Sequence, residues 1–166
     1  MQKKRTDYIT WDDYFMGISL ISALRSKDPN TQVGACIVNE ENKIVGIGYN
    51  GFPKGCSDDE LPWNREGNNE LEKKYLYVVH AEQNAILNST TSLKNCKMYV
   101  ALFPCNECCK IIIQSGIKEI IYLDDKYANS DSVKASKIML NMAKVNYRKH
   151  IPKDKKISIS LEVKNE

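Results

Sequence analysis

The stretch MYVALFPCNECCKIIIQSGIKEIIYL, residues 98–123, decides the fold class of this chain. Its two ends, Met98–Leu102 and Ile117–Leu123, are short runs of apolar and β-branched residues, which is typical of strands. Between them, Cys105–Ser115 has the apolar spacing of a helix, and Gly116 follows where helices commonly end. The stretch therefore predicts a strand–helix–strand unit in an α/β protein.

The rest of the chain extends this unit in both directions. Thr10, with Asp13 three residues later, predicts the start of a helix that continues to about Arg25. Two runs, Val33–Val38 and Ile44–Tyr49, flank a polar turn and predict a hairpin. Further helices are expected at His80–Leu87 and Val133–Lys144, and strand-like pieces at Val145–Arg148 and Ile157–Val163. We therefore expect a three-layer α-β-α sandwich around a central mixed sheet of about five strands.

The segment Asn50–Val79 interrupts this alternation. It carries scattered glycines and prolines among acidic residues, and it shows helical character only around Leu71–Leu76. An irregular segment of this length between regular elements is usually functional or disordered.

Composition points to one globular domain spanning residues 1–166, with polar tails at 1–8 and 160–166 that we expect to be disordered. Of the 166 residues, 42% are hydrophobic and 27% charged, which excludes an intrinsically disordered or collagen-like chain. The 24 basic and 21 acidic residues leave a net charge of +3, with no long basic run. Neither a nucleic acid nor an anionic membrane surface is therefore expected as a partner.

The expected location and the distribution of cysteines together favour a metal or catalytic site over disulfides. No stretch approaches the ~20 apolar residues of a membrane span, and the first residues lack the apolar core of a signal peptide. We therefore expect a cytoplasmic protein. In such a reducing compartment, six unevenly clustered cysteines indicate a metal or catalytic site more often than disulfides.

Two short motifs could carry chemistry. Cys105 and Cys108 are three residues apart at the start of a predicted helix, which places both sulfurs on one face. With His80, at the start of the preceding helix, they could hold a tetrahedral zinc ion and leave its fourth position open, as catalytic zinc sites do. Glu82, two residues beyond His80, could then serve as a proton shuttle.

Each motif alone also has a plainer interpretation. A single C-x-x-C in an α/β protein can be a redox pair or half of a structural zinc site. A structural site would need a fourth protein ligand, and Cys109 points about 100° away from Cys108 on a helix. Cys36 and Cys96 are expected in the core.

Longer runs carry a resemblance to a known family. They are Arg25–Pro29, Gln32–Asn39, Gly46–Gly51 and Tyr99–Cys108, together with the paired H-x-E and P-C-x-x-C motifs of zinc deaminases. From about Ile9 to Ile159 the chain resembles the eukaryotic-type deoxycytidylate (dCMP) deaminases. The resemblance implies a cytidine-deaminase-like fold and hydrolytic deamination of dCMP to dUMP with release of ammonia, which supplies dUMP for thymidylate synthesis.

The resemblance also assigns roles to single residues. It implies His80, Cys105 and Cys108 as ligands of one catalytic zinc ion, whose bound hydroxide attacks cytosine C4, and Glu82 as the catalytic acid and base. Substrate contacts are expected from Asn50, Ala81 and Tyr127, and the 5′-phosphate is expected near Arg25, Ser26 and Lys27. Each of these residues also has a plainer interpretation. Asn50 can be a turn residue, Tyr127 can be an aromatic residue at the edge of the cavity, and Arg25–Lys27 can be the basic end of a helix.

Only the resemblance indicates how the protein is regulated and how its subunits assemble. It implies activation by dCTP and inhibition by dTTP, both with Mg²⁺, and a homohexamer. Gly48, Asn50 and Gly51 are the candidate contacts to the regulatory nucleotide. Two alternatives stay open: a zinc deaminase acting on free cytidine, guanine or a tRNA adenosine, and a zinc module without catalysis.

Overall fold

The computed structural model describes residues 2–154 and 156–162, and its centre is a five-stranded mixed sheet of order β2-β1-β3-β4-β5. The strands are β1 (Gly34–Val38), β2 (Ile44–Tyr49), β3 (Lys97–Leu102), β4 (Glu119–Asp124) and β5 (Asn146–Lys149). β1 runs antiparallel to both β2 and β3, whereas β3, β4 and β5 are parallel. This confirms the expected mixed sheet.

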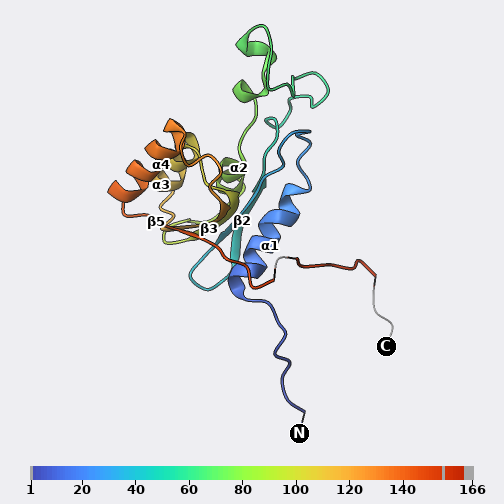
Figure 1. Ribbon diagram of the computed structural model, residues 1–166, viewed down its shortest axis with the longest axis vertical. Helices are drawn as coiled ribbons and strands as arrows, with labels where there is room; N and C mark the ends of the chain where they lie inside the picture. The colour runs from blue at the N-terminus through green and yellow to red at the C-terminus, as the bar shows by residue number, and fades with distance from the viewer. Residues whose placement is uncertain (1, 155, 163–166) are drawn as a thin grey trace.

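Helices cover both faces of the sheet, so the expected three-layer sandwich is also confirmed (Figure 1). They are α1 (Trp11–Ala23), α2 (Ala81–Leu87), α3 (Asn106–Gln114) and α4 (Asp131–Met142). α1 lies on one face, and α2, α3 and α4 on the other. Thr10 caps α1 by accepting a hydrogen bond from the Asp13 backbone N–H at 3.1 Å.

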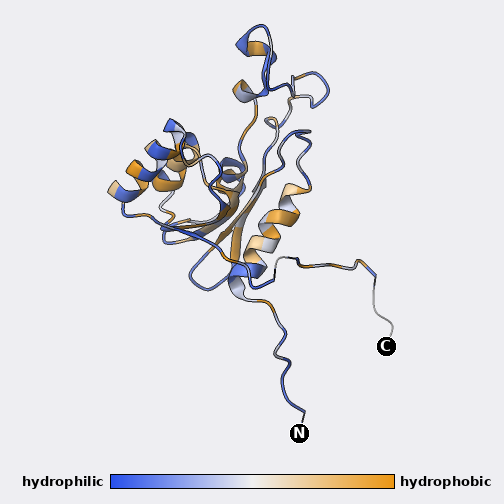
Figure 2. Ribbon diagram, in the orientation of Figure 1, coloured by the Kyte–Doolittle hydropathy of each residue, from blue (hydrophilic) through white to orange (hydrophobic). Residues whose placement is uncertain are grey.

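The alternation of side chains along each strand divides the core into two layers. In β1, Ala35 and Ile37 face the layer beneath α2, α3 and α4, whereas Cys36 and Val38 face α1. All five residues of β1 are buried, because helices cover both of its sides. Figure 2 shows the resulting apolar strands between the two helical layers.

The expectation of a terminal strand was wrong. Residues 157–162 have no regular secondary structure, and Val163 lies outside the described residues. Ile157 and Ile159 instead line a groove with Leu20 of α1 and with Leu24, which directly follows that helix. Their alternation therefore reflects contact with a helix rather than strand pairing.

The segment Asn50–Val79 contains two short 3₁₀ helices, Glu70–Glu72 and Lys74–Leu76, where the sequence indicated helical character. It projects beyond the end of the sheet (Figure 1). Gly51 joins its two ends through paired backbone hydrogen bonds with Val79, at 3.1 and 2.9 Å.

A buried carboxylate also ties this segment to the rest of the fold. Asp28 is 2% exposed and forms an ion pair with buried Lys74. The same carboxylate accepts hydrogen bonds from Asn50 Nδ2 at 3.3 Å and from the backbone N–H of Asn30 and Thr31 at 2.9 and 3.3 Å. Burial alone would raise the pKa of Asp28, but these bonds outweigh it and hold the pKa below its usual value.

Helix α2 lies unusually close to β2. A Cβ added at Gly48 would overlap the backbone N of Ala85 and the backbone O of Ala81, so only glycine allows this approach. Two amide side chains fix the position of α2 along the strand. Asn84 Nδ2, within α2, donates to Tyr49 O at 2.8 Å, and Nδ2 of Asn88, directly after α2, donates to Ile47 O at 2.9 Å.

Within the described part of the chain, no helix is both long and apolar enough to span a membrane.

Gly48→Ala tests the close approach of α2. The methyl group must displace the helix backbone, so we expect a loss of about 1–3 kcal/mol in unfolding free energy, measured by urea denaturation. Gly51→Ala is the matched control, because nothing lies within 4 Å of its added Cβ. Equal stability of the two variants would show that α2 does not depend on Gly48.

Asp28→Asn tests the buried ion pair. Removal of one partner leaves the Lys74 charge buried, which typically costs about 3–5 kcal/mol of unfolding free energy at pH 7. Because the folded-state pKa of Asp28 is lowered, its contribution is complete above the unfolded pKa and is lost as the pH falls through the folded value. The stability difference between wild type and variant should therefore shrink below about pH 4.

Asp58→Asn is the control for this measurement. Asp58 pairs with Lys27, whose side chain is 64% exposed, so its removal should cost much less unfolding free energy than the loss of a buried partner. A cost for Asp28→Asn as small as this would contradict the proposed role of the buried pair.

Candidate active site

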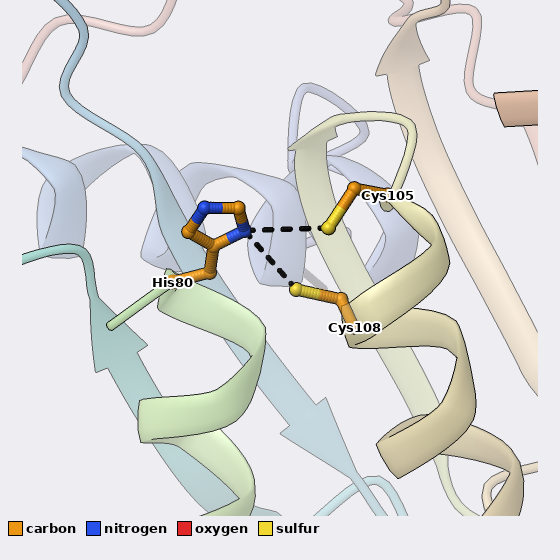
Figure 3. Close-up of side chains that lie close together, drawn as sticks. All are labelled: His80, Cys105 and Cys108. Atoms are coloured by element: carbon orange, nitrogen blue, oxygen red, sulfur yellow. Dashed lines mark hydrogen bonds between the residues drawn. The ribbon is translucent and has the colours of Figure 1, made fainter. Parts of the chain in front are cut away.

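Three side chains that could hold a metal ion meet where two helices begin. His80 immediately precedes α2 and Cys105 immediately precedes α3, while Cys108 lies in the first turn of α3. His80 Nδ1 lies 3.5 Å from Cys105 Sγ and 3.3 Å from Cys108 Sγ. All three ligand atoms lie within 4.8 Å of one another, and Figure 3 shows the imidazole ring facing both sulfurs.

This geometry fits a zinc ion. Zinc–nitrogen and zinc–sulfur bonds at a tetrahedral angle place the two ligand atoms about 3.6 Å apart, close to the spacing observed here. Cys109 does not join the cluster, because its buried thiol lies 3.8 Å from Pro104 O. Cys36 and Cys96 are buried in the core, as the sequence predicts. Three protein ligands leave a coordination position open, which is the pattern of catalytic zinc sites.

Electrostatics at the cluster favour a thiolate ligand. Cys108 and then His80 interact with the Cys105 sulfur and lower the pKa of Cys105 to about 4, against the opposing effect of burial. Cys105 in turn raises the pKa of His80 to about 9, because the two side chains interact directly. Binding of a metal would displace the proton from His80.

Hydrogen bonds from neighbouring residues hold the helix starts in place. The His80 backbone N–H donates to Gln83 Oε1 at 3.1 Å. Ser132 Oγ donates to Asn106 Oδ1 at 2.7 Å and connects the starts of α3 and α4. Ser136 Oγ donates to Pro104 O at 3.0 Å, directly before Cys105. These contacts hold the backbone beside the three candidate ligands in place, as hydrogen bonds around a metal site commonly do.

The cluster opens into a cavity of about 420 Å³, a size suited to a small molecule. Glu82 lines it and is only 5% exposed. Burial is the main cause that raises the pKa of Glu82, so its carboxyl group can hold a proton more readily than an exposed glutamate. A carboxyl group that can hold a proton therefore lines the same cavity as His80 and Cys105.

Some of the substrate residues expected from the sequence line this cavity. Asn50, Ala81 and Tyr127 do so, and Tyr127 is half exposed. The Asn50 amide is largely occupied within the fold, since Nδ2 donates to Asp28 and to Thr31 O, and Oδ1 accepts from the Val33 N–H at 2.9 Å. One acceptor position on Oδ1 stays available to a ligand.

The expected phosphate contacts lie elsewhere. Arg25, Ser26 and Lys27 are not among the described residues that line the cavity. Lys27 forms an exposed ion pair with Asp58, and Ser26 Oγ donates to Asn50 O at 2.9 Å. Within one subunit, these three residues therefore do not line the cavity beside the cluster, and their role as phosphate contacts stays a prediction.

The candidate regulatory positions already have partners. Gly48 packs against α2, and its carbonyl accepts from Ser22 Oγ at 3.0 Å. Gly51 uses both backbone groups in its bridge to Val79. A regulatory role for Gly48, Asn50 and Gly51 stays a prediction.

Sequence reasoning missed several cavity residues. They include Asp28, Thr31, Arg65 and Lys74, and the last two come from the irregular segment before α2. No local pattern marks Arg65 or Lys74. Only the path of this segment beyond the end of the sheet brings them to the cavity.

Comparison with known proteins identifies the family. Residues 9–124 match the model described as the cytidine and deoxycytidylate deaminase zinc-binding region. Human deoxycytidylate deaminase is 62% identical over 161 residues, covering 96% of this chain and 90% of the human protein. A probable deoxycytidylate deaminase of Drosophila melanogaster is 57% identical over 165 residues, covering 96% of this chain and 81% of that protein.

A solved structure agrees with the sequence comparisons. The dCMP deaminase of cyanophage S-TIM5, in complex with dCMP and dUMP, superposes with a TM-score of 0.63 at 25% identity. The match covers 84% of this chain and 95% of the phage chain. The chain therefore belongs to the cytidine and deoxycytidylate deaminase family of zinc-dependent hydrolytic enzymes.

Proposed function

We propose that this chain catalyses hydrolytic deamination of dCMP to dUMP with release of ammonia, supplying dUMP for thymidylate synthesis. The observation that carries the proposal is the buried carboxylate of Glu82 in the cavity that also receives His80 and Cys105. The human and phage relatives, named as deaminases of dCMP, support the choice of substrate.

His80, Cys105 and Cys108 would hold the zinc ion, whose chemistry when bound is to lower the pKa of water to about 7 and so supply hydroxide at neutral pH. Glu82 accepts the proton of the attacking water on a carboxylate oxygen. It delivers that proton to N3 of the cytosine ring while the oxygen adds to C4. Glu82 then takes the remaining hydroxyl proton and passes it to the amino group, which leaves as ammonia.

Other cavity residues would hold the nucleotide during these transfers. We assign contacts with the substrate to Asn50, through its remaining acceptor position, and to Ala81 and Tyr127 at the cavity wall. Burial of Glu82 excludes bulk water from the proton-transfer path, which strengthens the electrostatic interactions there.

Glu82→Gln tests the mechanism. The amide cannot accept and return a proton, so ammonia release from dCMP should fall by about 10²–10⁴-fold while zinc content stays near that of wild type. Cys105→Ser is the contrasting variant, because it should lose zinc as well as activity. Metal analysis and an ammonia assay on the same preparations provide both readouts.

Two results would contradict the proposal. Near-normal turnover by zinc-loaded Glu82→Gln would exclude Glu82 as the proton carrier. If zinc-replete wild-type protein released no ammonia from dCMP, deoxycytidine or CMP, the alternative of a zinc module without catalysis would be supported instead.

Regulation and assembly are proposed from the family resemblance, and location from the sequence-based expectation of a cytoplasmic protein. We propose that dCTP with Mg²⁺ activates the enzyme and that dTTP with Mg²⁺ inhibits it. We also propose that six copies assemble, that each chain forms one domain, and that the protein is cytoplasmic. Addition of dCTP and Mg²⁺ should lower the dCMP concentration needed for half-maximal rate, and dTTP should raise it. Sedimentation analysis should give the mass of six chains, and a monomer insensitive to both nucleotides would exclude this regulation.

A further inference from the structure

The cationic side chains of the cavity differ in whether their charge is balanced. Lys74 lines the cavity, but its ammonium group is paired with the buried carboxylate of Asp28. Arg65 also lines the cavity, is exposed, and donates from Nη2 to the Thr31 hydroxyl at 2.7 Å. Among the described residues, no carboxylate lies within ion-pair distance of Arg65. Its charge is therefore available to an anion in the cavity.

The contact with Thr31 also orients Arg65. The Thr31 backbone is fixed on both sides, because its N–H donates to Asp28 at 3.3 Å and its carbonyl accepts from Asn50 Nδ2 at 2.9 Å. The buried network around Asp28 therefore anchors the backbone of the residue whose hydroxyl holds Arg65. A guanidinium group held in this way loses less conformational entropy on binding a ligand.

The other negative charges of the cavity do not oppose an anion at this position. Asp28 is neutralised by Lys74, and Glu82 belongs to the reaction centre beside His80. Arg65 keeps four of its five N–H donors in a planar array that matches two oxygens of a phosphate group.

We infer that Arg65 binds the 5′-phosphate of the substrate and makes the site select nucleotides over nucleosides. This inference rests on the proposed deaminase function, and it replaces Arg25, Ser26 and Lys27 as the phosphate contacts. The base then lies toward His80 and Glu82, with the phosphate at the entrance formed by Thr31 and Arg65.

Kinetics on dCMP and deoxycytidine test the assignment. Arg65→Gln should lower kcat/KM for dCMP by about 10–100-fold, mainly through KM, because a charge-assisted pair is lost. Activity on deoxycytidine, which has no phosphate, should change less than about twofold. Arg65→Lys should fall between wild type and Arg65→Gln on dCMP, because lysine keeps the charge but not the planar pair of donors.

Lys54→Gln is the matched control, since it removes an exposed cation of the same segment that does not line the cavity. It should leave both substrates unaffected, and zinc content should be equal in all variants. Equal losses on dCMP and deoxycytidine in Arg65→Gln would show a structural role and overturn the inference. Unchanged kinetics on dCMP would place the phosphate elsewhere and also overturn it.

A binding measurement separates this inference from the proposed function. Calorimetric titration with dUMP and with deoxyuridine needs no catalysis. Wild type should prefer dUMP, and Arg65→Gln should lose that preference. If wild type released no ammonia, the proposed function would fail, and the titration would still decide the role of Arg65.

Discussion

The close approach of helix α2 to strand β2 is the constraint on which the rest of the site depends. Because Gly48 presents no side chain to the helix, the α2 backbone packs directly on the strand, and Asn84 and Asn88 fix its position along β2. This contact places the start of α2 beside the start of α3. His80 can then face two cysteine sulfurs, and Glu82 enters the same cavity.

The buried hydrogen-bond network around Asp28 stabilises another part of the cavity wall. It joins three distant parts of the chain, at residues 28–31, 50 and 74, through one carboxylate. A buried ion pair contributes little net stability compared with an apolar contact of equal size, but its geometry is specific. Here that geometry holds an irregular segment over the cavity and orients the residues that line its entrance.

The elements of regular structure were largely predictable from sequence because each has its own periodicity. The strand–helix–strand unit, the hairpin and the first helix all occur close to the predicted residues. The strand predicted at Ile157–Val163 was the exception within the described residues, because an alternating apolar pattern does not distinguish a strand from a tail whose Ile157 and Ile159 lie against a helix. The start of α4 at Asp131 was missed by two residues, since Ser130 rather than an apolar residue marks it.

The sequence by itself predicted that Cys105 and Cys108 share one face at the start of a helix, because their spacing fixes this, and the H-x-E motif added His80 and Glu82 as candidates. Only the tertiary structure decided which cations reach the cavity. Lys27 follows the first helix closely, yet it pairs with Asp58, whereas Arg65 comes from the irregular segment and lines the cavity. Such a segment has no periodicity from which its direction can be inferred, so its contacts depend on long-range partners such as Asp28.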